Sequence, residues 1–108
     1  PEWYPGDDVV DIVSVDVYPE AGNHDPLAER YENLRKLVND SKMIALAENG
    51  SIPDPQQMEE QGIYWSWFCT WTGEFLRGGQ HNTVGFLKEV YNSDYVVTLD
   101  QLPQWSWK

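Results

Sequence analysis

Several residue types and patterns are scarce or missing in this chain of 108 residues, and each absence excludes something. The single Cys69 cannot form an internal disulfide, and it lacks the neighbouring ligands of a metal site. His24 and His81 have no paired spacing and are interpreted as loop residues. No apolar run reaches the roughly 18 residues of a membrane span. No Gly-rich phosphate-binding loop follows a predicted strand, which excludes a small flavodoxin-like domain. We expect neither a metal nor a cofactor.

Positive charge is also scarce. Seven basic side chains against 18 acidic ones give a net charge of −11. That balance argues against a nucleic acid or an anionic membrane as partner and favours a neutral or cationic one. Aromatic side chains are abundant, with six Trp and six Tyr, and the composition is that of a globular chain. The length permits one small domain with a modest core.

Strand and helix patterns alternate along the chain. Near-continuous apolar runs predict the first two strands, and alternating aromatic and small residues predict the third. Asp25-Pro26 and Asp54-Pro55 each combine an N-cap with a proline in the first helical turn. The predicted strands are residues 9–16, 43–47 and 64–70, and the predicted helices are residues 26–39, 55–61 and 82–92, with residues 95–99 as a short extended piece or a strap. In the last helix, Val84, Leu87, Val90 and Tyr91 share one face.

The order of these elements predicts parallel β/α units. Parallel strands are buried on both faces, which agrees with the apolar runs of the first two. Three such units alone leave two open sheet edges, which is a poor design for a free-standing protein. We therefore infer a fragment of a larger sheet or barrel.

Glu48 draws attention because it ends the apolar run 43–47 and is followed by Asn49 and Gly50, which breaks the strand. A charged side chain is rarely buried, so Glu48 is expected where the strand leaves the core. The carboxyl ends of parallel strands are where α/β proteins place their sites. Carboxylates, a phenol and an indole gathered there suit a neutral sugar. The residues expected at this rim are Asp16, Tyr18, Glu48, Asn49, Trp71 and Glu74.

Each of these residues also has a structural interpretation. Asp16 can cap the following loop through the backbone, and Tyr18 can pack under that loop. Glu48 can pair with a Lys or Arg from a neighbouring loop. Glu74 is a rim acid without a fixed partner, for which a solvated loop charge is the simpler interpretation. Trp65 and Trp67, within the predicted third strand, are expected to pack.

Four motifs resemble the C-terminal part of the glycoside hydrolase family 26 β-mannanases. They are residues 3–7, 10–18, 47–54 and 67–71, and the resemblance continues to residues 98–103. It implies a (β/α)8 TIM barrel of which residues 1–108 form the C-terminal portion, with strands 6 to 8 of a single catalytic domain. The family also implies a secreted, extracellular enzyme. The chain itself opens on Pro1-Glu2-Trp3-Tyr4 with no signal-peptide pattern, and we expect this start to be a cut.

The resemblance assigns roles to named residues. Glu48 matches the nucleophile of a retaining mechanism, and Tyr18 matches the residue that hydrogen-bonds and orients it. Trp71 matches the floor of the subsite that holds the sugar under attack, and Asp16 and Asn49 are expected to contact substrate. The implied reaction is endo-hydrolysis of β-1,4-mannosidic bonds in mannan, glucomannan or galactomannan, with mannan and manno-oligosaccharides as ligands.

The acid/base Glu of the family follows strand 4, which this sequence does not include. A retaining mechanism needs two carboxyl groups about 5–5.5 Å apart. The remainder of the barrel is therefore an expected partner, and the isolated chain is expected to be inactive. Two alternatives stay open. One is a non-catalytic carbohydrate-binding module, and the other is a β-glucanase or β-1,3-xylanase of the same family.

Overall fold

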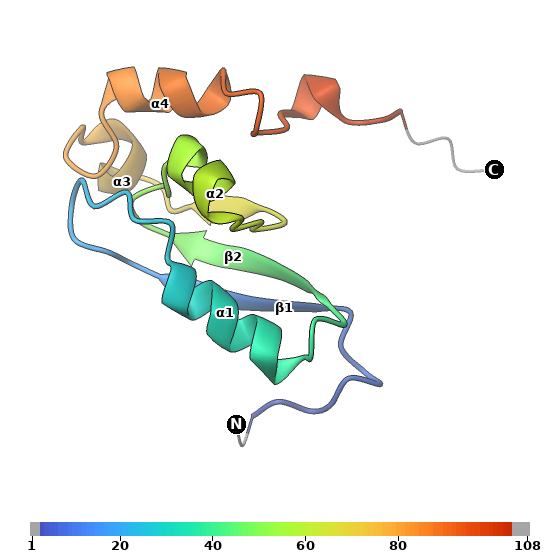
Figure 1. Ribbon diagram of the computed structural model, residues 1–108. Coiled ribbons are helices and arrows are strands. Elements are labelled where there is room, and N and C mark those ends of the chain that lie inside the picture. Colours follow the sequence, from blue (N-terminus) through green and yellow to red (C-terminus); the bar gives the residue numbers. More distant parts are fainter. Residues whose placement is uncertain (1–2, 105–108) are drawn as a thin grey trace.

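The computed structural model describes residues 3–104 as three strands and four helices with a final 3-10 turn (Figure 1). The strands are β1 (Ile12–Val17), β2 (Met43–Asn49) and β3 (Phe68–Thr70). The helices are α1 (Ala28–Leu37), α2 (Pro55–Gln61), α3 (Glu74–Arg77) and α4 (Val84–Tyr91), and the 3-10 turn is η1 (Leu99–Gln101). None of the helices within these residues is long and apolar enough to cross a membrane.

The strands form one parallel sheet in the order β1-β2-β3. The predicted parallel α/β arrangement is therefore confirmed. Because β2 is central, β1 and β3 each keep one edge unpaired within residues 3–104. The loops that follow β1 and β2 lie at the same end of the sheet as α3 (Figure 1). This end carries the side chains that the sequence singled out.

The pairing of β1 with β2 changes register near the carboxyl end. Val15 pairs with Leu46, and the next pair is Asp16 with Glu48, so Ala47 has no partner on β1. A strand that carries one extra residue bends there and redirects the side chains that follow. Partner residues on adjacent strands point to the same face, so Asp16 and Glu48 lie side by side on one face.

The core sits between the sheet and the helices. A cluster of Tyr31, Ile44, Met58 and Ile63 is buried, and Leu46, also on β2, is fully buried. These residues come from α1, β2, α2 and the segment after α2. The core therefore fixes β2, and with it Glu48, against both helices.

The helix at 55–61 is confirmed with the expected ends. The Asp54 carboxylate accepts hydrogen bonds from the backbone N–H groups of Gln56 (2.8 Å) and Gln57 (3.2 Å), and Pro55 occupies the first turn. Gly62 ends the helix with a φ of 67°, a left-handed conformation that glycine adopts without steric cost.

The first helix begins two residues later than predicted. Asp25 accepts a hydrogen bond from the N–H of Leu27 (2.7 Å), which forms a local turn before the helix. Leu27 then takes a left-handed φ of 61° and occupies the N-cap without a side-chain cap. The prediction that Asp25 caps this helix is therefore wrong, because its carboxylate closes the preceding turn instead.

The strand predictions need three corrections. The first strand is Ile12–Val17 and not residues 9–16, because residues 7–9 form a turn and Val9 is exposed. The second strand continues through Glu48 and Asn49, so Glu48 lies on the strand and not beyond it. The third strand is only Phe68–Thr70, because the chain before it runs irregularly. There the Trp65 indole turns inward, donates to the carbonyl of Pro26 (3.0 Å) and packs edge-on against Tyr31.

The C-terminal half also differs in detail. The short helix α3 was not predicted, and α4 is shorter than the expected 82–92. Of the residues expected on its inner face, Val90 is fully buried, whereas Val84 and Tyr91 are exposed. Residues 95–99 form no strand. They act as a strap, because the Tyr95 hydroxyl donates to the carbonyl of Ile63 (2.5 Å).

Candidate active site

The Tyr18 hydroxyl donates a hydrogen bond of 2.6 Å to Oε2 of Glu48. Tyr18 directly follows β1. Glu48 is the penultimate residue of β2 and lies on the same face of the sheet as Asp16. The Tyr18 side chain is half exposed, with 45% of its surface accessible, and Glu48 is partly buried. The family resemblance paired Tyr18 with Glu48. The hydroxyl and the carboxylate of these residues are thus hydrogen-bonded at a solvent-accessible position.

The contact changes the acidity of the phenol. The hydrogen bond to Glu48 raises the pKa of Tyr18 to about 12, with smaller contributions from desolvation and from the charges of Glu48 and Asp16. A phenol with that pKa keeps its proton throughout the neutral range. Tyr18 therefore remains a donor, and it holds one carboxylate oxygen of Glu48 while the other oxygen stays available.

The alternative interpretation of Glu48 as half of an ion pair is not observed. Within residues 3–104, both ion pairs involve Arg35, which contacts Glu32 (3.1 Å) and Asp40 (2.5 Å) on and after α1. Asp16 is exposed beside Glu48, and its carboxylate forms no hydrogen bond to the following loop within the same residues. Glu48 and Asp16 therefore form a locally acidic surface next to a phenolic donor.

Trp71 lies just beyond β3 at the same end of the sheet. Its backbone N–H donates to the carbonyl of Asn49 (2.9 Å), which fixes it beside the end of β2. The indole is exposed over 48% of its surface. An exposed indole at this position is available to stack against the C–H face of a sugar.

Asn49 differs from the expectation that it contacts substrate. Its side chain is fully buried, and Nδ2 donates to Oγ1 of Thr70 (3.1 Å) and to the carbonyl of Ser51 (3.3 Å). These bonds tie β2 to β3 and to the loop after β2. A fully buried side chain cannot reach a ligand at the rim. The expectation that Asn49 contacts substrate is therefore wrong, and its role is structural.

The remaining candidates lie in loops or on α3. Glu74 is exposed at the start of α3. His24 stacks on Phe86 with ring centroids 3.7 Å apart, and its Nδ1 lies 2.7 Å from the carbonyl oxygen of Ile52. His81 packs against Phe75 at 4.6 Å. Both histidines are thus loop residues, as predicted, and within residues 3–104 no group of three or more His, Cys, Asp or Glu is placed to hold a metal ion.

Three residues behind the site were not recognised from the sequence as functional. The Tyr18 ring packs against Phe75 of α3, with ring centroids 5.3 Å apart, and both rings approach the backbone of Gly50. The buried amide of Asn82 bonds to the carbonyls of Gly50 and Phe75. No local pattern in the sequence predicts these contacts, because the bonds from Asn82 to Gly50 and Ile52 join positions about 30 residues apart.

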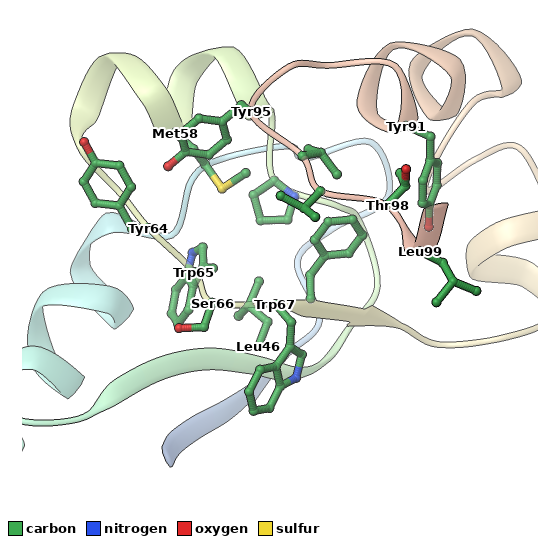
Figure 2. A pocket seen from close by; sticks show the side chains of 14 residues that line it. Leu46, Met58, Tyr64, Trp65, Ser66, Trp67, Tyr91, Tyr95, Thr98 and Leu99 are labelled. Carbon is green, nitrogen blue, oxygen red and sulfur yellow. The ribbon is translucent and has the colours of Figure 1, made fainter. Parts of the chain in front are cut away.

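A separate apolar hollow of about 610 Å³ lies between β3 and the C-terminal strap (Figure 2). Aromatic side chains dominate it, and the residues around it include neither Glu48 nor Tyr18. Trp67, at its edge, is exposed over 42% of its surface. The hollow is therefore distinct from the rim at which Tyr18 meets Glu48. Its aromatic members are Tyr64, Trp65, Trp67, Phe68, Tyr91 and Tyr95.

Comparison with known proteins gives consistent matches. The family model of glycosyl hydrolase family 26 matches residues 1–101. The chain is 45% identical over 105 residues to a mannan endo-1,4-β-mannosidase of Thermothelomyces thermophilus, and 37% identical over 99 residues to mannan endo-1,4-β-mannosidase A of Piromyces sp.. These matches cover 97% and 92% of this chain but only 21% and 16% of those relatives. The chain thus spans about a fifth of the length of the curated relatives.

Solved structures give the same result. The β-(1,4)-mannanase of Podospora anserina superposes with a TM-score of 0.87 at 46% identity, covering 93% of this chain and 22% of that one. A ruminal endo-β-1,4-mannanase superposes with a TM-score of 0.91 at 36% identity, covering 97% of this chain and 24% of that one. A β-mannanase from a termite symbiotic protist, solved with a gluco-manno-oligosaccharide, gives 0.86 at 32% identity over 96% of this chain and 31% of that one.

Proposed function

The chain belongs to glycosyl hydrolase family 26, and we propose that it forms the nucleophile side of a retaining β-1,4-mannanase active site. The observation that carries the proposal is the hydrogen bond from Tyr18 to Glu48 at the carboxyl end of a central parallel strand. The activity named for the relatives, hydrolysis of mannan, supplies the reaction class. The named activity of the relatives also favours mannan over the β-glucan and β-1,3-xylan alternatives.

In this mechanism the free carboxylate oxygen of Glu48 attacks the anomeric carbon of a mannosyl unit. A bond forms between that oxygen and the carbon as the glycosidic bond breaks, and the leaving oxygen takes a proton from a second carboxyl group. Water, deprotonated by that second group, then cleaves the glycosyl ester and restores Glu48. The second carboxyl group would come from a part of the barrel outside residues 1–108.

Tyr18 contributes orientation. Its hydroxyl holds Oε2 of Glu48 at 2.6 Å, so the carboxylate is fixed before substrate arrives and less entropy is lost on the way to the transition state. The pKa of Tyr18, raised to about 12, keeps the donor in place at every pH at which the enzyme would work.

Two exposed side chains are proposed to bind the sugar. The backbone N–H of Trp71 holds its main chain at the rim, where the exposed indole would form the floor beneath the mannosyl ring. Asp16, beside Glu48, would accept hydrogen bonds from sugar hydroxyls. Asn49 is left out of the binding site because its side chain is buried.

The rest of a (β/α)8 barrel is proposed as the partner of this chain. The unpaired edges of β1 and β3 within residues 3–104 would pair with further strands of the barrel. The family resemblance implies that the three strands are numbers 6 to 8 of that barrel. The apolar hollow beside β3 is the kind of surface that neighbouring barrel elements cover. Residues 1–108 alone are expected to be inactive, and the complete enzyme is proposed to act outside the cell.

A carbohydrate-binding module is the less supported alternative. Such modules are mostly antiparallel β, whereas this chain forms a parallel sheet with an amphipathic α1 and a capped α2. Within residues 3–104, the exposed aromatic side chains lie both at the rim and around the hollow, so they do not form one flat sugar-binding strip at the Glu48 site.

The proposal is tested by Glu48→Ala in a complete barrel that contains residues 1–108. We expect hydrolysis of β-1,4-mannan to fall at least 1,000-fold, roughly the effect of losing a nucleophile, while mannan binding is largely kept. Added azide should restore turnover and release an α-mannosyl azide, because the small anion attacks from the side that Glu48 vacated. Glu89→Ala, on the exposed face of α4, is the matched control and should behave like wild type. Near wild-type hydrolysis by Glu48→Ala would contradict the assignment of Glu48 as the nucleophile.

A further inference from the structure

Asn82 is a buried amide whose hydrogen bonds join three backbone groups. Its side chain is fully buried in the loop between α3 and α4. Nδ2 donates to the carbonyl oxygens of Gly50 (2.9 Å) and Phe75 (2.8 Å), and Oδ1 accepts from the N–H of Ile52 (2.8 Å). One side chain therefore fastens the loop that follows β2 to helix α3.

The two carbonyls belong to residues that enclose the Tyr18 ring. A Cβ built on Gly50 would lie 3.1 Å from Cδ1 of Phe75 and 3.3 Å from Cδ1 of Tyr18, so both rings pack directly on the Gly50 backbone. The rings of Tyr18 and Phe75 also pack on each other, tilted by 59°. Gly50 is further fixed by its N–H, which donates to the carbonyl of Val17 (3.3 Å).

We propose that Asn82 is a positioning residue, which holds Gly50 and Phe75 together around the Tyr18 ring and thereby fixes the Tyr18 hydroxyl on Glu48. The inference rests on the function proposed above for Glu48. The path from Asn82 to the carboxylate consists of packed or hydrogen-bonded neighbours at every step. Asn82 itself acts only through Tyr18 and does not touch the carboxylate.

A simpler role for Asn82 is to satisfy buried backbone groups. Removing its amide leaves two carbonyls and one N–H without their partner, which lowers stability whether or not the site is affected. A measurement of stability alone therefore does not separate the two roles. The separating measurement is the state of the Tyr18 phenol, which a merely structural role would leave unchanged.

The experiment compares Asn82→Ala with Asn92→Ala in the complete barrel. Asn92 is a matched control, because its exposed amide also donates to a carbonyl, that of Lys88 (2.7 Å), at the end of α4. Tyrosine is labelled with ¹³C at the ring carbon that bears the hydroxyl, and the Tyr18 signal is assigned by its loss in Tyr18→Phe. The ionised fraction of Tyr18 is then read at pH 11, with folding checked by the amide spectrum.

With a pKa of about 12, wild-type Tyr18 should be about one tenth ionised at pH 11. In Asn82→Ala the loosened ring loses its bond to Glu48, and we expect more than half to be ionised. The kcat on mannan should fall roughly tenfold with KM within about twofold, because the carboxylate is misplaced while sugar binding is kept. Asn92→Ala should match wild type in both measurements.

A lowered melting temperature with unchanged Tyr18 ionisation and unchanged kcat in Asn82→Ala would contradict the proposal. If that variant does not fold, Gly50→Ala tests the same path without removing a hydrogen bond, since its Cβ meets both rings. We expect it to raise Tyr18 ionisation in the same way, and an unchanged phenol would contradict the proposal. Absence of mannanase activity in the wild-type barrel would instead contradict the proposed function, while the ionisation measurement still tests the role of Asn82.

Discussion

Asp16 lies beside Glu48 because β1 and β2 shift register by one residue at Ala47. In an unshifted pairing Asp16 would face Ala47, and Glu48 would pair with Val17 and point to the opposite face from Asp16. The irregularity therefore turns Glu48 to the face on which Tyr18 reaches it. A bulge at the end of a strand commonly redirects a functional side chain in this way.

Tyr18→Phe removes the hydroxyl that holds Glu48 and leaves the ring that packs on Phe75. We expect kcat on β-mannan to fall roughly 10- to 100-fold, since a less well-aligned nucleophile reaches the transition state less often. KM should change little, because the hydroxyl is engaged with Glu48 and not with the sugar. Steady-state kinetics of the complete barrel tests this, and an unchanged kcat would show that Glu48 needs no such partner.

The Tyr18 phenol should lose its proton at an unusually high pH. The Tyr18 phenol has a pKa of about 12 in the folded chain and about 10 in the unfolded chain. The hydrogen bond from Tyr18 to Glu48 therefore stabilises the fold fully below about pH 10, and this stabilisation is lost as pH rises through about 12. Glu48→Gln removes the negative charge and should move the Tyr18 midpoint down toward 10. Absorbance at 295 nm follows the change.

Tyr4 serves as an internal control for that titration. Its hydroxyl donates to Asp7, and this contact raises the pKa of Tyr4 to about 12 independently of Glu48. Burial also raises the pKa of Tyr95, again without a contribution from Glu48. The raised pKa values of Tyr4 and Tyr95 should therefore remain in Glu48→Gln, and only Tyr18 should titrate lower. An unchanged Tyr18 midpoint would show that the Glu48 charge does not control Tyr18.

Trp71→Ala removes the indole at the rim. We expect mannan affinity to fall roughly tenfold, which corresponds to the loss of one aromatic stacking contact of about 1.4 kcal/mol. Trp3→Ala is the matched control, since Trp3 is 91% exposed and lies before β1. Isothermal titration with manno-oligosaccharides measures both variants, and equal affinities for the two would take Trp71 out of the binding site.

Asp54→Ala removes the cap of α2. Two backbone N–H groups lose their acceptor, so the free energy of unfolding should fall by about 1 kcal/mol. Asp54→Ser keeps an acceptor and should recover most of that loss. Denaturant unfolding of the complete barrel measures both, and no difference between Ala and Ser would mean that the cap does not contribute.

The sequence predicted the parallel β/α order and the capped helix at 55–61 because these depend on local patterns. The partnership of Tyr18 with Glu48 came from family resemblance, since no periodicity pairs residues 30 positions apart. Long-range packing determined what could not be predicted. The register shift at Ala47 depends on the partner strand, and the burial of Asn49 depends on Thr70 of a third strand.

The same reason explains the short β3 and the unrecognised Asn82. Trp65 leaves the expected strand to reach Pro26, and Asn82 meets partners on two other segments. Neither side chain carries a local signal for these distant bonds. A polar residue in a predicted loop gives no indication of whether it will be solvated or will hold a buried turn in place.

The most direct test of the central claim is to trap the covalent intermediate. A complete barrel that contains residues 1–108 is incubated with a 2-deoxy-2-fluoro-mannoside carrying a good leaving group, which slows breakdown of the glycosyl ester more than its formation. Peptide mass spectrometry then locates the label. We expect a single fluoromannosyl group on Glu48 and none in Glu48→Ala. A label on another carboxylate would contradict the account, as would an active wild-type enzyme that accumulates no label.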